Sequence, residues 1–136
     1  MSRLVLDASV TLCWLFEDQA TAYTDSVLDR LGGGDGAVVP AIWPFEIANA
    51  VAVAERRKLV NPAQAVAFLQ TLGQLSIAVD RKIEQIFNAV LEAARRYRLS
   101  AYDAGYLELA MREALPLATL DAALRNAARA AGVRLA

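Results

Sequence analysis

The sequence predicts a three-layer α/β/α domain in which helices cover a central parallel sheet of about five strands. Short apolar runs of strand length alternate along the chain with longer segments whose apolar residues recur at helical spacing. This alternation is typical of parallel strands joined by crossover helices. No repeat or low-complexity segment interrupts the pattern, so residues 1–136 are expected to form one domain.

The first half of the chain predicts two strands and several helices. The apolar runs 4–6 and 38–39 have strand length, and the glycine-rich stretch 32–36 breaks the chain before the second of them. Asn61 followed by Pro62 suits an N-cap and the first helical position. Apolar spacing and Pro44 predict helical segments over 10–16, 23–31, 44–56 and 62–72.

The second half continues the alternation. Ile77 and Val79 predict a third strand, and Ser100 is placed to open a helix. Gly132 is a natural stop for the alanine-rich helix before it. The remaining predictions are a helix over 83–97, strands over 117–119 and 133–135, and the alanine-rich helix over 122–131.

Composition limits the class of protein. Apolar residues make up 57% of the chain and charged residues 21%, which excludes a disordered chain and favours an apolar surface for a partner protein. No apolar run approaches the length of a membrane span and no signal peptide is visible, so a cytoplasmic location is expected. The single cysteine, Cys13, lies between Leu12 and Trp14 and is interpreted as a small buried hydrophobe.

The chain contains no histidine. This excludes Ser-His-Asp and Cys-His catalysis, imidazole general bases and histidine-ligated zinc. Any chemistry must therefore use carboxylates, hydroxyls, lysine, arginine or a bound ion.

Four acids stand out, although each has an ordinary explanation. Asp7 and Asp121 each follow a predicted strand and precede a helical segment, as N-caps do. Asp103 lies three residues after Ser100, as the acid of a capping box would. Glu46 follows Pro44 in what is predicted to be the first turn of a helix, where the helix dipole favours a negative charge.

The joint placement of these acids suggests a site. Asp7 and Asp121 lie just beyond the carboxyl ends of parallel strands, where open α/β sheets bind their ligands. Glu46 and Asp103, near helix N-termini, are expected at the same edge. Carboxylates that converge repel one another unless they hold a cation, and oxygen ligands favour Mg²⁺ or Mn²⁺. Such a site suits phosphodiester hydrolysis.

The sequence resembles the PIN domains, and among them the VapC-type toxin ribonucleases of toxin-antitoxin pairs. The resemblance covers nearly the whole chain and rests on four blocks in order, LVLDASV, WPFEIANAV, LSAYDAGYLELA and LATLDAALRNAARAAGV. It places the acidic quartet of the family on Asp7, Glu46, Asp103 and Asp121. Our hypothesis is that Asp7, Asp103 and Asp121 hold the metal while Glu46 orients or deprotonates the attacking water.

Further residues follow from the same resemblance. Ser9, Asn49 and Thr119 match polar companions of the acids that position them or a water. The family implies Mg²⁺- or Mn²⁺-dependent RNA cleavage, a homodimer or a toxin–antitoxin hetero-oligomer, and a VapB-type antitoxin whose C-terminal segment lies along an apolar groove. Candidates for that groove or the dimer contact are Trp14, Phe16, Trp43 and Phe45, which core packing would also explain.

The basic clusters have two interpretations. Arg56, Arg57, Arg95 and Arg96 lie where helices are expected to end, so they either complement helix dipoles or contact RNA phosphates.

Two other functions stay open. A Mg²⁺-dependent phosphatase of the haloacid-dehalogenase kind needs Asp-x-Asp after the first strand, and here the tripeptide is Asp7-Ala8-Ser9. A PIN-like module without turnover, which only binds a partner protein, would not need all four acids. Ala122 and Ala123 stand where some PIN domains carry a further acid, which argues against a second metal ion.

Overall fold

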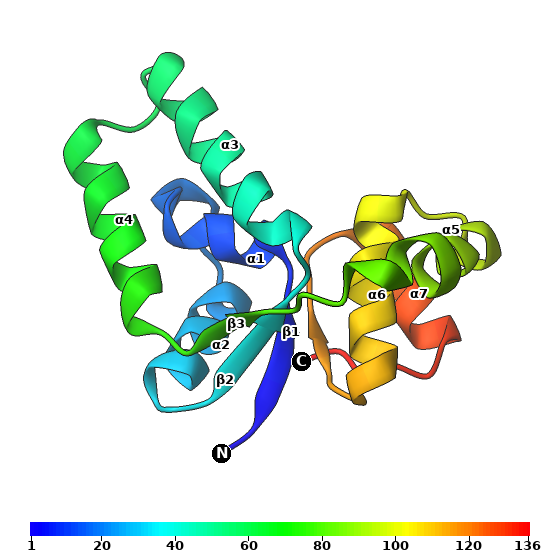
Figure 1. Cartoon of the computed structure of the whole chain (residues 1–136). Helices are drawn as coiled ribbons and strands as arrows, with labels where there is room; N and C mark the ends of the chain where they lie inside the picture. Colours follow the sequence, from blue (N-terminus) through cyan, green and yellow to red (C-terminus); the bar gives the residue numbers. More distant parts are fainter.

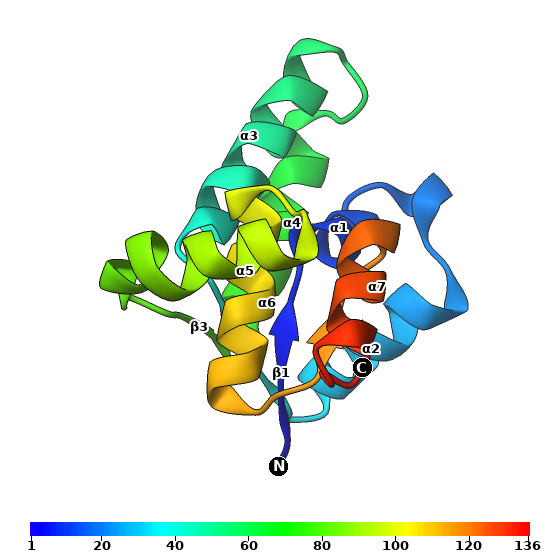
Figure 2. The same cartoon turned by 90° about the vertical axis from the view of Figure 1, so that its right-hand side faces the viewer.

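A parallel sheet of four strands forms the centre of the molecule in the computed structural model, which describes residues 1–136 (Figure 1). The strands are β1 (Arg3–Leu6), β2 (Gly36–Val39), β3 (Ile77–Val79) and β4 (Leu117–Ala118), in the order β3-β2-β1-β4. Helices flank the sheet on both sides, as Figures 1 and 2 show together, so the predicted α/β architecture with a parallel sheet is confirmed.

The predicted fifth strand is reduced to one bridge. The amide of Val133 donates to the carbonyl of Ala128 and so still belongs to the end of the preceding helix. Pairing with β4 starts only at Arg134, whose carbonyl accepts from Leu117, and it leaves a single parallel bridge between Leu117 and Leu135. The sheet therefore has four strands and not five.

Seven α-helices connect the strands. Side-chain caps begin four of them: Thr21, Asn61, Ser100 and Asp121 each accept a hydrogen bond from the amide three residues later. The helices are α1 (Ala8–Thr11), α2 (Ala22–Gly32), α3 (Ile42–Arg56), α4 (Pro62–Gln74), α5 (Leu91–Tyr97), α6 (Ala101–Glu113) and α7 (Ala122–Ala130).

Two predicted helices are less regular than expected. The helix over 10–16 is α1 followed by a 3₁₀ turn at Leu12–Trp14. The helix over 83–97 is a 3₁₀ turn at Ile83–Gln85, a π turn at Ile86–Val90 and then α5. In this second segment Ile83, Ile86 and Phe87 are exposed, so their helical spacing does not come from a stripe that faces the core.

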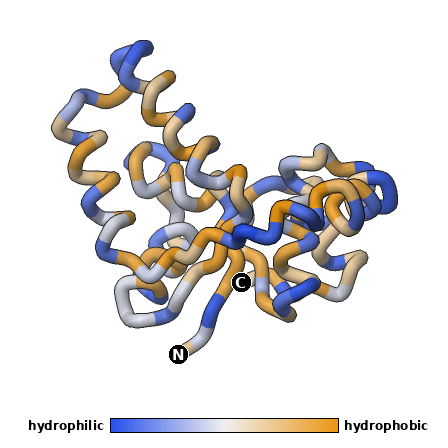
Figure 3. Tube along the Cα trace, viewed as in Figure 1, coloured by the Kyte–Doolittle hydropathy of each residue, from blue (hydrophilic) through white to orange (hydrophobic).

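The core is centred on β1. Leu4, Val5 and Leu6 are fully buried, as expected for a parallel strand covered on both faces, and Leu107 and Leu109 of α6 join them in one apolar cluster. Figure 3 shows this distribution: apolar residues follow β1 and β2, whereas the outer end of α3 is hydrophilic. No helix in the structure is long and apolar enough to cross a membrane.

Most of the aromatic candidates for a contact surface belong to the core. The indole of Trp43 donates to Thr11 Oγ1 at 3.2 Å, and that of Trp14 donates to the carbonyl of Thr24 at 3.0 Å. Phe16 packs against the same cluster. Phe45, which is 73% exposed, is the one candidate left for a partner surface.

Cys13 is buried as predicted, and burial raises the pKa of its thiol.

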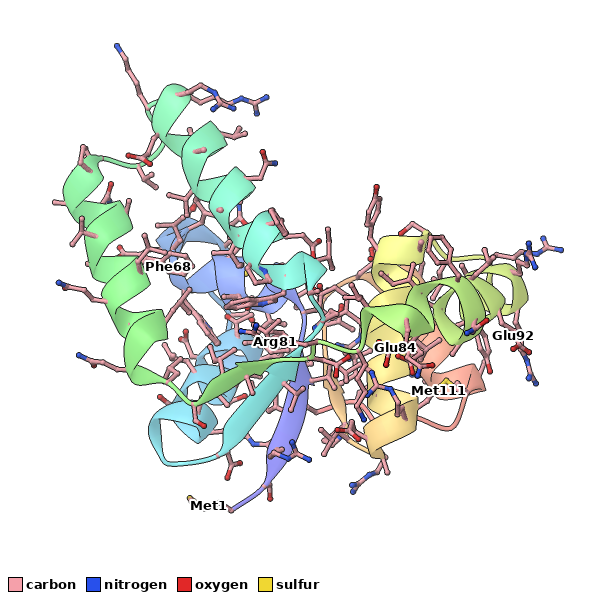
Figure 4. The ribbon with its side chains drawn as sticks, viewed as in Figure 1. Met1, Phe68, Arg81, Glu84, Glu92 and Met111 are labelled. Carbon is pink, nitrogen blue, oxygen red and sulfur yellow. The ribbon has the colours of Figure 1, made fainter.

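Arg112, near the end of α6, donates to Glu108 at 2.9 Å and to Asp80, just after β3, at 2.7 Å. Both carboxylates raise the pKa of Arg112. This triad ties the segment that leaves β3 to α6; Arg81 and Glu84 mark the start of that segment in Figure 4.

Candidate active site

The four acids come from four separate elements near the carboxyl edge of the sheet. Asp7 directly follows β1, and Asp121 lies three residues after the neighbouring strand β4. Asp103 is in the first turn of α6, which packs on β1 and β4. Glu46 is the fifth residue of α3, since that helix begins at Ile42 and not at Pro44. Its predicted place in the first helical turn is therefore wrong by about one turn.

The carboxylates act on one another electrostatically. Burial raises the pKa of Asp103, and the negative charges of Asp121 and Asp7 raise it further. Burial also raises the pKa of Glu46, to which the charges of Asp7 and Asp103 add. The four acids are therefore linked electrostatically, and we call them the acidic cluster; their catalytic role stays a prediction.

Asp7 is fixed by two hydroxyl groups. Its side chain is only 5% exposed, and its Oδ2 accepts hydrogen bonds from Ser9 Oγ at 2.7 Å and Thr119 Oγ1 at 2.6 Å. Each hydroxyl in turn accepts from a backbone amide, that of Leu120 or Asp121. Because a hydroxyl has one proton to donate, these amides orient both hydroxyls toward Asp7.

This arrangement corrects the N-cap interpretation of Asp7. Asp7 occupies the N-cap position of α1 by its backbone, but its side chain accepts no hydrogen bond from the helix. Both of its hydroxyl partners, Ser9 and Thr119, had been predicted from the sequence as companions of the acids. Asp7 Oδ1 makes no hydrogen bond and remains available for a ligand.

The other two aspartates differ from one another. Asp121 Oδ2 accepts a hydrogen bond from the amide of Leu124 at 2.8 Å, so Asp121 caps α7 as predicted. Only one of its two carboxylate oxygens is used in this cap. The amide of Asp103 donates to Ser100 Oγ at 3.1 Å, but no reciprocal bond from the Asp103 carboxylate completes a capping box. The predicted box is thus only half formed, and the carboxylate of Asp103 is not used as a cap.

Sequence reasoning missed two residues of this region. Tyr106 is fully buried and donates to Glu46 Oε1 at 2.5 Å; its position three residues after Asp103, on the same face of α6, was the available signal. Arg125 donates to the carbonyl of Thr119 at 2.7 Å and lies over the ring of Tyr23. Nothing in the sequence pattern indicated the Arg125 contact.

The remaining candidates are not joined to the acids. Asn49 is exposed and makes no side-chain hydrogen bond. Arg56 ends α3 ten residues beyond Glu46, which is about 15 Å along the helix axis, and Arg57 follows it. Arg95 and Arg96 are exposed in the last turn of α5, where Arg96 lies over the ring of Tyr97. None of these four arginines forms an ion pair with an acid.

The donor atoms of the cluster suit a hard divalent cation. They are carboxylate oxygens without histidine or thiolate. Burial and then repulsion between carboxylates raise the pKa values of Glu46 and Asp103, and a cation relieves such repulsion. No group of three or more acids in the structure lies close enough together to hold a metal ion by itself. This is compatible with Mg²⁺, which is usually held by one or two carboxylates and keeps several of its waters.

An apolar groove of about 310 Å³ lies between α3, α6 and the segment after β3. Phe45 and Tyr102, both exposed, line it, and each directly precedes an acid of the cluster in the sequence, Glu46 and Asp103. The groove also contains Ile42, Ile83 and Ile86.

Fold and site together define an α/β protein with an acidic cluster at the carboxyl edge of a parallel sheet. The chain belongs to the PIN domain family, whose family model matches residues 4–130. PIN domains are generally metal-dependent nucleases. A comparison with curated protein sequences found no significant match.

Two solved structures have a similar fold. The crystal structure of PAE2754 from Pyrobaculum aerophilum has 20% sequence identity and a TM-score of 0.64, over 93% of this chain and 79% of that one. The crystal structure of FitAcB from Neisseria gonorrhoeae has 21% identity and a TM-score of 0.63, over 97% of this chain and 95% of that one. At these sequence identities, the similarity to the two structures shows a shared fold and no more.

Proposed function

We propose that the protein is a metal-dependent endoribonuclease that serves as the toxin of a VapBC-type toxin-antitoxin pair. The observation that carries this proposal is the acidic cluster, in which burial and the charges of neighbouring carboxylates raise the pKa values of Glu46 and Asp103 in a chain without histidine. Membership of the PIN family supports the nuclease activity. The four sequence blocks quoted above support the toxin role.

In this proposal Asp7, Asp103 and Asp121 hold one Mg²⁺ or Mn²⁺ ion, directly or through water. The ion, when bound, lowers the pKa of a water and neutralises charge on the phosphate oxygens. Ser9 and Thr119 keep Asp7 in place, with Oδ1 available to the site. Glu46 orients the attacking water and accepts its proton, a task for which a raised carboxyl pKa is suited.

The ends of the cleaved RNA test this chemistry. Attack by water in line with the leaving oxygen is expected to leave a 5′-phosphate and a 3′-hydroxyl, and chelation by EDTA should stop cleavage until Mg²⁺ or Mn²⁺ is restored. End-labelled RNA analysed by sequencing gels provides both measurements. Products with 2′,3′-cyclic phosphates would show that the ribose hydroxyl was the nucleophile and would exclude this mechanism.

The same assay separates the other functions. Hydrolysis of p-nitrophenyl phosphate without RNA cleavage would support the phosphatase. Inertness toward both substrates, combined with tight binding of a partner protein, would support the binding module.

We further propose that the apolar groove receives the C-terminal segment of the antitoxin and that the toxin forms a homodimer. The groove presents exposed Phe45 and Tyr102, the residues directly before Glu46 and Asp103 in the sequence, and would be shielded from water by an amphipathic segment.

Phe45→Glu is expected to weaken antitoxin binding at least about tenfold, because an anchor of this size contributes roughly 2 kcal/mol when buried. Phe87→Glu is the matched control, since Phe87 is 83% exposed but does not line the groove. Calorimetry measures the affinity of each variant for the antitoxin, which is expected to be the product of the reading frame next to that of the toxin. Light scattering measures whether the toxin forms a homodimer. Equal losses in both variants would remove the groove as the binding site.

A further inference from the structure

Tyr106 is the one residue whose side chain is hydrogen-bonded to Glu46. It lies on α6, one turn after Asp103, and its ring is fully buried. The backbone amide of Ala8, the first residue of α1, also acts on this hydroxyl and lowers its pKa slightly. Burial and the charge of Asp7 both raise the pKa of Tyr106 above its ordinary value, so the hydroxyl keeps its proton.

The chemistry of the two groups fixes the direction of this hydrogen bond. A tyrosine hydroxyl has a single proton to donate, and an ionised carboxylate can only accept. The proton of Tyr106 is therefore directed at Glu46 Oε1, which leaves Glu46 Oε2 as the oxygen without a hydrogen bond in the structure.

This hydrogen bond joins α6 to α3. Because Tyr106 shares a helical face with Asp103, the bond ties the helix that carries Asp103 to the helix that carries Glu46.

We propose that Tyr106 is a positioning residue, which holds one oxygen of Glu46 so that the other faces the acidic cluster and the attacking water. This inference rests on the proposed nuclease function, because it assigns Tyr106 a part in the action of Glu46. The same hydrogen bond lowers the pKa of Glu46 against the effects of burial and of its acidic neighbours.

Tyr106→Phe is expected to lower kcat for RNA cleavage roughly ten- to hundredfold, the equivalent of a hydrogen bond to a charged group, with KM changed less than about twofold. Tyr23→Phe is the matched control: it also removes a buried hydroxyl, but one without a hydrogen-bond partner, so its kcat should equal that of the wild type. In a Glu46→Gln background, Tyr106→Phe should cause no further loss, because the residue it acts through has already been altered.

A second measurement does not depend on activity. In the metal-free chain, the carboxyl carbon of Glu46 followed by NMR should titrate at higher pH in Tyr106→Phe than in the wild type or in Tyr23→Phe. If Tyr106→Phe does not fold, 3-fluorotyrosine at position 106 keeps the hydroxyl as a stronger donor and should move the titration of Glu46 to lower pH.

The outcomes separate the two proposals. A wild-type chain that cleaves no RNA would overturn the proposed function, and with it the catalytic part of this inference. An active wild type with an unchanged kcat in Tyr106→Phe, or additive losses in the double variant, would overturn the role of Tyr106 alone. An unchanged NMR titration would show that the hydrogen bond does not act on Glu46.

Discussion

Asp7→Asn is expected to reduce metal-dependent RNA cleavage by about a thousandfold or more, the equivalent of roughly 4 kcal/mol of lost transition-state stabilisation. Beside burial, the charge of Asp7 contributes to the raised pKa values of Glu46, Asp103 and Tyr106, so it acts on more than one group of the site. Two hydroxyls fix one of its oxygens, so the variant alters the charge at a position that cannot easily adjust. Single-turnover cleavage of a labelled RNA, in buffers with controlled trace metals, provides the measurement.

Asp103→Asn should cause a similar loss, whereas Asp18→Asn should leave the rate unchanged because Asp18 is exposed and makes no side-chain hydrogen bond. Cleavage by Asp7→Asn at the wild-type rate would remove Asp7 from the site and with it the proposed metal ligands.

The stability of Asp103→Asn shows whether its lost activity reflects unfolding. Because the pKa of Asp103 is raised in the folded chain, its ionisation opposes folding, and the metal-free wild type loses stability as pH rises from the ordinary aspartate pKa through the raised value. The variant has no charge at this position. It should therefore be the more stable of the two at neutral pH, with a difference that disappears in acid, as thermal unfolding across this range would measure.

Arg112→Met is expected to cost about 2–4 kcal/mol of unfolding free energy, the largest stability effect of a single substitution proposed for this chain. Arg112 is only 19% exposed and is the partner of both Asp80 and Glu108, and Glu108 is buried. The substitution keeps the aliphatic packing but leaves two carboxylates without their cation, one of them with almost no access to water. Urea unfolding followed by circular dichroism gives the difference, provided that the dependence on urea is the same in both chains.

Two variants test this explanation. Glu108→Gln in the Arg112→Met background should restore part of the loss, because it removes the buried charge left without a partner. Arg30→Met breaks the pair with Asp35, where Arg30 is 37% exposed, and should cost at most about 1 kcal/mol. Equal losses in Arg112→Met and Arg30→Met would mean that burial of the triad contributes nothing.

Much of the fold could be predicted because its signals are local. The strand before Asp7 is a continuous apolar run because it is buried on both faces, and Asn61 forms the predicted N-cap, which Gln64 completes as a capping box. The segment from Ile83 to Val90 was predicted as a regular helix because apolar spacing alone does not tell whether those residues face a core or a groove.

The site was predictable to the extent that four acids follow strands or begin helices. The contacts that each acid makes could not be predicted. Asp7 and Asp121 have nearly the same local sequence, yet one accepts hydroxyl protons and the other caps a helix. The difference is decided by Thr119, which contacts Asp7 across 112 positions of sequence, and Tyr106 reaches Glu46 across 60. Contacts at such separations leave no periodic signal in the chain.

The hydrogen bond between Thr119 and Asp7 also has a consequence for biosynthesis. It joins the first strand to the strand that is made last, and the ordering of Asp7 depends on both. A nascent chain that has not yet released residues 117–121 from the ribosome lacks this hydroxyl and lacks Asp121. For a protein that we propose to cut RNA, the cluster is therefore assembled only after residues 117–121 have left the ribosome.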